Sequence, residues 1–231
     1  MRGALPRASF VRSLPVMAGY LVLGAGFGIL LAQAGYGPLW ALGMSLTVYA
    51  GSMQYVGVSL IAGEASVLTT ALTALMVNAR HLFYGLSMLP MYRDAGWRRL
   101  TLALTLTDET YSLLCDGETP AGMAPHAFRL WVSLFNYSYW VLGSFLGGLL
   151  GQKLPFDTTG IDFSMTALFV TMFVEQWRST REHRPALLGL GGTLACLWLF
   201  GQEVFLIPAM AVIIGALLLL RPRLEGGTQD V

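Results

Sequence analysis

A group of polar residues interrupts a long apolar stretch between residues 66 and 90. Arg80 stands near the middle of this stretch, with Asn78, His81 and Tyr84 close to it in the sequence. An arginine at the centre of a bilayer costs on the order of 3 kcal/mol on insertion scales, so we expect it to face the protein interior and to have a partner there. In a continuous helix, Asn78, His81 and Tyr84 share one side. The pattern predicts a polar stripe in which the guanidinium group of Arg80 binds a carboxylate through two hydrogen bonds.

Two adjacent acids, Asp108 and Glu109, carry the charge that would match Arg80. Neighbouring side chains on a helix point about 100° apart, so at most one of these acids can face the Arg80 stripe. A carboxyl group removed from water binds a proton more readily, which is the property that a proton-coupled transporter needs. We therefore predict that Asp108 and Glu109 serve in proton coupling. Two alternatives stay open: an arginine–acid pair that only joins two helices, and a pair of solvated acids at the membrane interface.

A third polar element, Ala50-Gly51-Ser52-Met53-Gln54, lies in the middle of an apolar segment. Glycine followed by serine weakens a helix locally, and an unwound stretch exposes backbone groups that can bind an amino or a carboxylate group. The alternative is close packing, because small residues and glutamine also join transmembrane helices. Taken together, the polar elements contain seven candidate substrate-binding residues: Gly51, Ser52, Gln54, Asn78, Arg80, His81 and Tyr84.

Catalytic motifs are missing from the sequence. It has no His-Glu-x-x-His element, no Gly-x-Ser-x-Gly element and no closely spaced cysteine pair. The two cysteines, Cys115 and Cys196, lie in apolar surroundings and resemble neither a disulfide framework nor a metal site. The sequence therefore predicts a protein that is not an enzyme, with no catalytic residue, no metal site and no cofactor.

The composition indicates which solvent surrounds these residues. Of the 231 residues, 55% are hydrophobic and 12% are charged, against roughly a quarter charged in soluble domains. Residues 13–63 form a run of 51 without an acidic or basic side chain, more than twice the roughly 20 that a helix needs to cross a bilayer. Every backbone polar group in lipid must be bonded within the protein, which favours helices. We predict an all-α polytopic membrane protein in the lipid bilayer, and the net charge of +1 without a basic stripe argues against a nucleic-acid partner.

Uncharged length and turn residues predict a bundle of seven or eight transmembrane helices in one transmembrane domain, residues 1–231. The expected spans are about 14–33, 39–62, 66–90, 99–116, 128–151, 160–177, 185–201 and 203–220. If 99–116 crosses, there are eight crossings and the N-terminus is cytoplasmic. If it does not, there are seven and the N-terminus is outside. Either topology puts nine basic residues inside and four outside, so the positive-inside rule does not choose, and both leave the C-terminus in the cytoplasm.

An internal duplication is visible at a constant offset of 119 residues. Between Tyr20 and Met53, 11 of 34 positions are identical to those found 119 residues later. Gly24 and Gly28 recur as Gly143 and Gly147, in a spacing typical of helix packing faces. We predict a first repeat at about 14–90 and a second at about 130–220. Eight crossings make the repeats parallel and seven make them inverted. Secondary transporters are often built from such repeats, with the substrate site near the midplane between them.

The polar motifs together resemble the large subunit of the azaleucine-resistance (AzlC) family of branched-chain amino acid exporters. The resemblance covers about residues 13–220, with the motifs in the family's order. It implies export of leucine, isoleucine, valine and their analogues across the bacterial inner membrane, and a separate small hydrophobic membrane subunit. Met53 departs from the family pattern, which usually has a small or another polar residue there, so the substrate range stays open. The motifs that carry the resemblance are Tyr49–Gln54, Asn78–Gly85, Thr107–Glu109, Ile161–Phe163 and Ala167–Phe169.

The expected function is therefore that of a proton-coupled secondary transporter in the inner membrane. In this hypothesis Arg80 binds the substrate carboxylate, and Gln54, Asn78 and backbone carbonyls near Gly51 bind its ammonium group. Apolar side chains of the repeat interface hold the rest of the substrate, and the two repeats rock against each other to alternate access. The alternative is a non-transporting membrane scaffold or assembly subunit, in which the Arg80 stripe only stabilises a complex.

Overall fold

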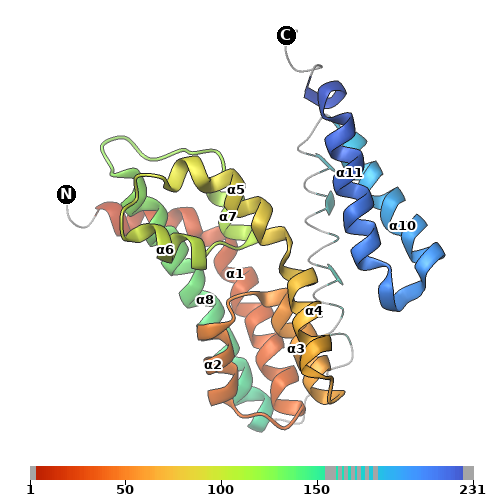
Figure 1. Cartoon of the computed structure of the whole chain (residues 1–231). Helices are drawn as coiled ribbons and strands as arrows, with labels where there is room; N and C mark the ends of the chain where they lie inside the picture. The colour runs from red at the N-terminus through yellow and green to blue at the C-terminus, as the bar shows by residue number, and fades with distance from the viewer. Residues whose placement is uncertain are drawn as a thin grey trace. The chain divides into compact units, whose positions relative to one another are not determined.

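The computed structural model describes residues 4–153 and 182–225 together with isolated positions between 160 and 178, and the described part of the chain has helices and no strand (Figure 1). The predicted all-α fold is therefore confirmed. The helices are α1 (Ala4–Gln33), α2 (Pro38–Thr47), α3 (Gly51–Ala62), α4 (Val67–Asn78), α5 (Arg80–Tyr92), α6 (Arg98–Leu104), α7 (Asp108–Leu114), α8 (Pro125–Lys153), α10 (Arg184–Val204) and α11 (Leu206–Glu225).

Three of the predicted continuous spans are broken near their middle. The segment 39–62 becomes α2 and α3, because residues 48–50 leave the helix and Ala50 is extended, with φ −149° and ψ 90°. The segment 99–116 becomes α6 and α7, because Thr107 is extended and caps α7 by accepting a hydrogen bond from the Thr110 N–H at 3.3 Å. The segment 66–90 is kinked at Ala79, where the N–H bonds to Met76 in a tighter turn. The breaks at Ala79 and Thr107 were not predicted, whereas the break before α3 directly precedes the Gly51-Ser52 pair, where an unwound stretch was one of the two alternatives.

The other predicted spans agree better with the structure. The span 14–33 lies within α1, which begins ten residues earlier, and the span 128–151 lies within α8. The predicted joint after 201 is also present, since Gly201 takes a left-handed φ of 74° that glycine adopts without strain. The span 160–177 falls largely outside the described residues. Among those described, the helical stretches Ala4–Gln33 and Arg184–Gly201 are long and apolar enough to cross a bilayer unbroken, with mean hydropathies of 2.0 and 1.2.

The helices form two compact units, Met1–Thr166 and Ala167–Val231. In the first unit, α1 and α8 form the central pair, with α2, α3, α6 and α7 packed against one or both of them. Helix α4 contacts α3, while α5 contacts α6 and α7. In the second unit, α10 packs against α11. The single transmembrane domain stays a prediction.

Glycines allow α1 and α8 to approach each other at backbone distance. A Cβ atom added at Gly28 would lie 2.2 Å from the Ser144 carbonyl oxygen, and one at Gly147 would lie 2.1 Å from that of Ala25. Gly24 meets Gly143, and Gly28 meets Gly147, so residues 119 apart in the sequence touch each other. The later residue on α1 meets the later residue on α8, so the two helices run parallel (Figure 1).

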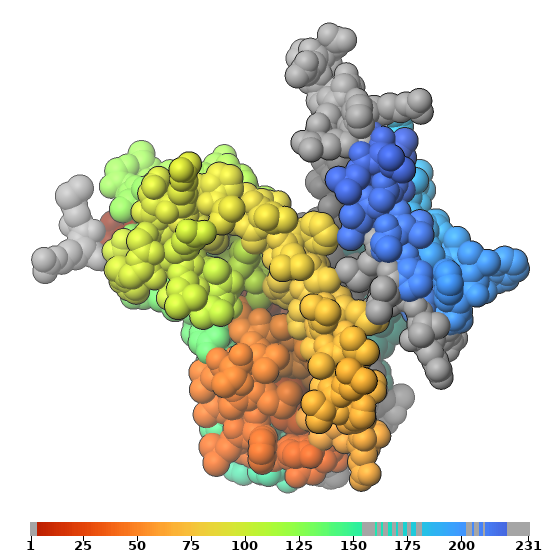
Figure 2. All heavy atoms as spheres, in the orientation of Figure 1, coloured from red at the N-terminus to blue at the C-terminus, as the bar shows by residue number. Residues whose placement is uncertain are grey.

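Helices α4 and α5 present large apolar side chains at the surface (Figure 2, gold and yellow). Val67 is 87% exposed and Leu82 and Leu86 are each 66% exposed. Exposed apolar side chains in this number are costly in water and favourable in lipid. The residues that form it are Val67, Leu68, Leu72, Leu75, Leu82, Phe83, Leu86 and Leu89.

Candidate functional site

The breaks in the three spans bring the starts of three helices together. Arg80 is the first residue of α5, Asp108 is the first of α7, and Ser52 is the second of α3. The Arg80 guanidinium donates through Nη1 to Asp108 Oδ2 and through Nη2 to Ser52 Oγ. The Arg80 side chain is 27% exposed and the Asp108 side chain is 8% exposed. The buried acid partner expected for Arg80 is therefore present, and it is Asp108.

Asp108 has a second oxygen that the arginine does not use. Its Oδ1 is buried and has no hydrogen-bond partner among the described residues. A buried carboxylate oxygen without a donor is costly, so such an atom marks a place where a cation or donor from outside the chain can bind. Arg80 thus has a further hydrogen bond to Ser52, whereas one oxygen of Asp108 has no donor among the described residues.

Asn78 and His81 lie beside the ion pair, but not on a single continuous helix as predicted. The kink at Ala79 ends α4 at Asn78 and starts α5 at Arg80. His81 Nδ1 is 3.2 Å from the Asn78 carbonyl oxygen, and the Asn78 Oδ1 is buried without a hydrogen-bond partner in the described part of the chain. Tyr84 follows one turn later and contacts the His81 ring edge-on, with 6.1 Å between the ring centroids. The predicted stripe survives as a cluster around the kink.

Gln54, a predicted substrate ligand, has two hydrogen-bond partners within the protein. Its side chain is fully buried, its Nε2 donates to Ser45 Oγ at 3.0 Å, and its Oε1 accepts from Trp140 Nε1 at 2.6 Å. The amide therefore joins α2, α3 and α8. Gly51 faces the same indole, because a Cβ there would lie 2.7 Å from the Trp140 ring. The structure thus supports the packing alternative for Gln54 and Gly51, while Ser52 accepts a hydrogen bond from Arg80.

Glu109 faces a different set of partners from Asp108, as the 100° spacing predicts. The Tyr20 hydroxyl donates to Glu109 Oε2 at 2.7 Å and lies 2.6 Å from Thr107 Oγ1. Thr107 donates to Thr110 Oγ1 at 3.1 Å, and Asn136 Nδ2 donates to the same Thr110 oxygen at 3.0 Å. This hydroxyl chain, Glu109–Tyr20–Thr107–Thr110–Asn136, connects the start of α7 with α1 and α8.

Sequence reasoning missed the rest of the hydroxyl chain. Asn136 was recognisable as a lone amide within the apolar run 128–151, and amides at membrane depth bond across helices. Tyr20 was noticed only as part of the repeat, where it recurs as Tyr139. No local signal links Tyr20 to Glu109, because 89 residues separate them.

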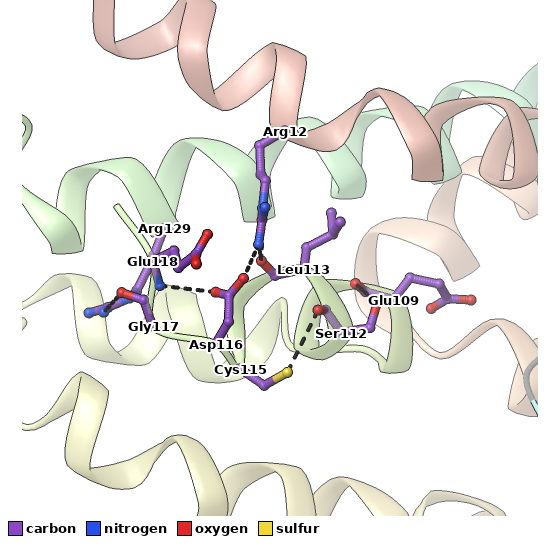
Figure 3. Close-up of polar contacts among 9 residues, drawn as sticks. All are labelled: Arg12, Glu109, Ser112, Leu113, Cys115, Asp116, Gly117, Glu118 and Arg129. Atoms are coloured by element: carbon purple, nitrogen blue, oxygen red, sulfur yellow. Dashed lines mark hydrogen bonds and ion pairs between the residues drawn. The ribbon is translucent and has the colours of Figure 1, made fainter. Parts of the chain in front are cut away.

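The other end of α7 is held by two arginines from α1 and α8 (Figure 3). Arg12 on α1 donates to the Leu113 carbonyl oxygen at 3.1 and 2.8 Å and also pairs with Asp116. Arg129 on α8 donates to the Gly117 carbonyl oxygen at 3.5 Å. Cations are favourable at the carbonyl end of a helix. In Figure 3 the Glu109 carboxylate points away from this arginine-bound end, so the two ends of α7 have separate polar environments.

Metal binding has no support in the described part of the chain, where no group of three or more His, Cys, Asp and Glu side chains could hold an ion. The site consists of an ion pair, a helix start and a chain of hydroxyls. These groups can bind charged and hydrogen-bonding parts of a small molecule, and they offer no activated nucleophile.

Comparison with known proteins assigns the chain to a family. The model of the family described as "AzlC protein" matches residues 15–154. The chain is 42% identical to the "Branched-chain amino acid transport protein AzlC" of Bacillus subtilis, over 95% of this chain and 86% of that protein. It is 42% identical to an "Uncharacterized membrane protein" of Helicobacter pylori, over 94% and 95% of the two chains. It is 26% identical to the "Inner membrane protein YgaZ" of Escherichia coli, over 83% and 81%.

No solved structure matches the chain. Its relatives carry the names of transport or membrane proteins and not of enzymes, which confirms the predictions of a membrane location, a transport role and a non-enzymatic protein. The match to the family model and the 42% identity along nearly the whole chain agree with the motifs on which the resemblance was based. The chain belongs to the AzlC family.

Proposed function

We propose that this protein is a secondary transporter that exports branched-chain amino acids across the bacterial inner membrane, coupled to protons and working with a small hydrophobic membrane subunit. The name of the Bacillus subtilis relative supports the substrate class, and the name of the Escherichia coli relative supports the inner membrane. The observation that carries the proposal is the Arg80–Asp108 ion pair at the meeting point of three helix starts.

The ion pair is chemically complementary to a zwitterion. Arg80 can bind the substrate carboxylate through its planar fork of donors, and the first N–H groups of α3 are unpaired within that helix and also favour an anion. Asp108 Oδ1 and Asn78 Oδ1, both buried without a hydrogen-bond partner among the described residues, can accept from the substrate ammonium group. In this proposal Asp108 binds substrate, a role that the sequence reasoning had given to Gln54. His81 and Tyr84 flank the bound molecule.

Glu109 is then the carboxylate left for proton coupling. It lies next to Asp108 in sequence, and it accepts a hydrogen bond from Tyr20 on α1. A proton arriving on Glu109 changes the charge beside the substrate pair without breaking that pair directly. Because the two adjacent acids have different partners, Asp108 can bind the substrate while Glu109 binds the proton.

The parallel course of α1 and α8 supports a topology with eight crossings. Parallel helices require an odd number of crossings between them. Counting the broken pairs α2–α3, α4–α5 and α6–α7 as one crossing each gives three. We propose that both termini are cytoplasmic and that the duplicated halves are parallel repeats, which Gly24 and Gly28 support by meeting their own counterparts 119 residues later.

Transport of labelled amino acids into proteoliposomes tests the proposal. The protein is reconstituted with and without the small subunit, and the flux of leucine, isoleucine, valine and methionine is measured under an imposed pH gradient. Flux that requires the gradient and is lost in Arg80→Ala supports it. Arg93→Ala, which removes an exposed arginine in the loop after α5, is the matched charge control and is expected to keep flux.

The same ion pair also fits the scaffold alternative, in which it only locks α5 to α7. Absence of flux with the small subunit present, together with loss of the complex in Arg80→Ala, would establish the scaffold and overturn the transporter proposal. Retention of full flux by a correctly inserted Arg80→Ala protein would overturn the binding role of Arg80 alone.

A further inference from the structure

We infer that the hydroxyl chain Glu109–Tyr20–Thr107–Thr110–Asn136 senses the proton on Glu109 by reversing the direction of its hydrogen bonds, and so transmits the protonation state of α7 to α8. The inference rests on the proposed function for the importance of Glu109. It adds a physical role for four residues that the proposed function does not use: Tyr20, Thr107, Thr110 and Asn136.

Counting hydrogens shows that one arrangement of the chain needs a proton on Glu109. Three contacts link the oxygens of Glu109, Tyr20, Thr107 and Thr110, at 2.7, 2.6 and 3.1 Å. Tyr20 and Thr107 carry one hydroxyl hydrogen each. With Thr107 donating to Thr110, the Tyr20 hydrogen can serve either Glu109 or Thr107. The third contact then needs a hydrogen from another group. Either a protonated Glu109 donates to Tyr20, or Thr107 turns to donate to Tyr20 and Thr110 donates to Thr107.

The two protonation states therefore use opposite directions. With Glu109 protonated, the carboxyl donates to Tyr20, Tyr20 to Thr107, and Thr107 to Thr110. With Glu109 ionised, the carboxylate only accepts, so Tyr20 donates to it, Thr107 to Tyr20, and Thr110 to Thr107. Each hydroxyl hydrogen stays on its own oxygen and rotates about the C–O bond, and the proton that binds Glu109 comes from water.

Asn136 is the last residue of the hydroxyl chain, and its hydrogen bond with Thr110 differs between the two arrangements. In the ionised arrangement Thr110 uses its hydrogen within the chain and accepts from Asn136 Nδ2, as seen at 3.0 Å. In the protonated arrangement the Thr110 hydrogen needs a new acceptor. Asn136 Oδ1 is fully buried and has no hydrogen-bond partner in the part of the chain that the structure describes. Rotating the amide by half a turn brings this oxygen to Thr110. The orientation of the Asn136 amide on α8 therefore depends on whether Glu109 is protonated.

Other charged or titratable groups also act on Glu109. They are Asp108 on its own helix, Arg80 on α5, Tyr20 on α1, and Tyr49 between α2 and α3. The groups that α8 contributes to the chain are neutral. A variant at Thr110 leaves all of these charges in place, so its effect on proton binding reports the chain itself.

The test is a titration of the full-length protein by infrared difference spectroscopy, in which the band of the protonated Glu109 carboxyl is identified by its absence in Glu109→Gln. Thr110→Val removes one hydrogen bond of the Thr107 hydroxyl in each arrangement. In the ionised arrangement Thr107 Oγ1 still accepts from the backbone N–H of residue 110, whereas in the protonated arrangement the Thr107 hydrogen is left without an acceptor. The midpoint of the band is therefore expected to fall by about one pH unit, a tenfold weaker proton affinity equal to about 1.4 kcal/mol. Tyr20→Phe removes the stronger, charge-assisted bond of the ionised arrangement, so its midpoint is expected to rise by a similar amount.

Two further variants control the experiment. Thr110→Ser keeps the hydroxyl and is expected to restore the wild-type midpoint. Ser133→Ala removes a fully buried hydroxyl one turn before Asn136 that has no hydrogen-bond partner among the described residues, so it is expected to leave the midpoint unchanged. Shifts of the same sign in Thr110→Val and Tyr20→Phe, or a shift in Thr110→Val no larger than in Ser133→Ala, would overturn the inference. Because the titration needs no flux, failure of the transporter proposal would be seen separately.

Discussion

Replacing Gly28 by alanine is expected to force α1 and α8 apart. The new Cβ would lie 2.2 Å from the Ser144 carbonyl oxygen and 2.4 Å from the Gly148 nitrogen, well inside the 3.4 Å at which ordinary contacts begin. Both atoms belong to the backbone of α8, so no side-chain rotation can relieve the clash. Alanine favours a helix by about 1 kcal/mol over glycine, but overpacking against a rigid neighbour costs about 1–3 kcal/mol. We expect a net loss of stability.

The assay compares glycine-to-alanine variants within α1. Gly19 lies on the same helix with no atom within 4 Å of its would-be Cβ, so Gly19→Ala is expected to leave stability unchanged or raise it by about 1 kcal/mol. Unfolding in SDS, followed by loss of helical circular dichroism, measures both variants under the same conditions. Gly147→Ala should resemble Gly28→Ala, because its Cβ would lie 2.1 Å from the Ala25 carbonyl oxygen. Equal stability of Gly28→Ala and Gly19→Ala would refute the packing argument.

Three further substitutions test the polar contacts. Arg80→Lys cannot form a two-pronged bond with a carboxylate, so the KM for leucine in proteoliposomes should rise about tenfold, and an unchanged KM would contradict the binding role. Trp140→Phe leaves the buried Gln54 Oε1 without its donor and should cost about 1–3 kcal/mol in SDS unfolding; a cost below that of an exposed substitution such as Trp97→Phe would argue against the bond. Arg12→Gln removes the cation at the end of α7 and should cost about 0.3–1 kcal/mol at low salt, with the difference shrinking at high salt.

The apolar pattern predicted the helical class and the positions of α1 and α8. It did not predict the breaks within the three spans that lie between these two helices in the sequence. A lack of charge shows that a segment can lie in lipid, but a helix can end inside a membrane protein only where other groups bond its free backbone ends. At Thr107 the partner is its own hydroxyl, which a sequence can suggest. At Ala50 no side chain caps the helix, and nothing in the local sequence marks the position beyond the following Gly51.

The residue types predicted the chemical kind of the site better than they predicted which residues form it. An arginine at membrane depth requires an acid partner, and the sequence offered Asp108 and Glu109 as candidates within a predicted span. The choice between them depends on the phase of α7, which the break after α6 sets. The partner of Gln54 could not be predicted because Trp140 is 86 residues away, and a polar side chain alone does not indicate whether it bonds a substrate or another helix.

By itself, the sequence determined that this protein is a helical membrane protein of the AzlC family, that glycines in a packing spacing recur 119 residues apart, and that few charges lie among the apolar segments. These properties follow from composition and spacing, which act locally along the chain. Only the tertiary structure decided that Asp108 pairs with Arg80, that Glu109 turns to Tyr20, and that Asn136 completes the hydroxyl chain. Those partners lie on different helices, and hydrogen bonds form only where packing brings donor and acceptor within about 3 Å.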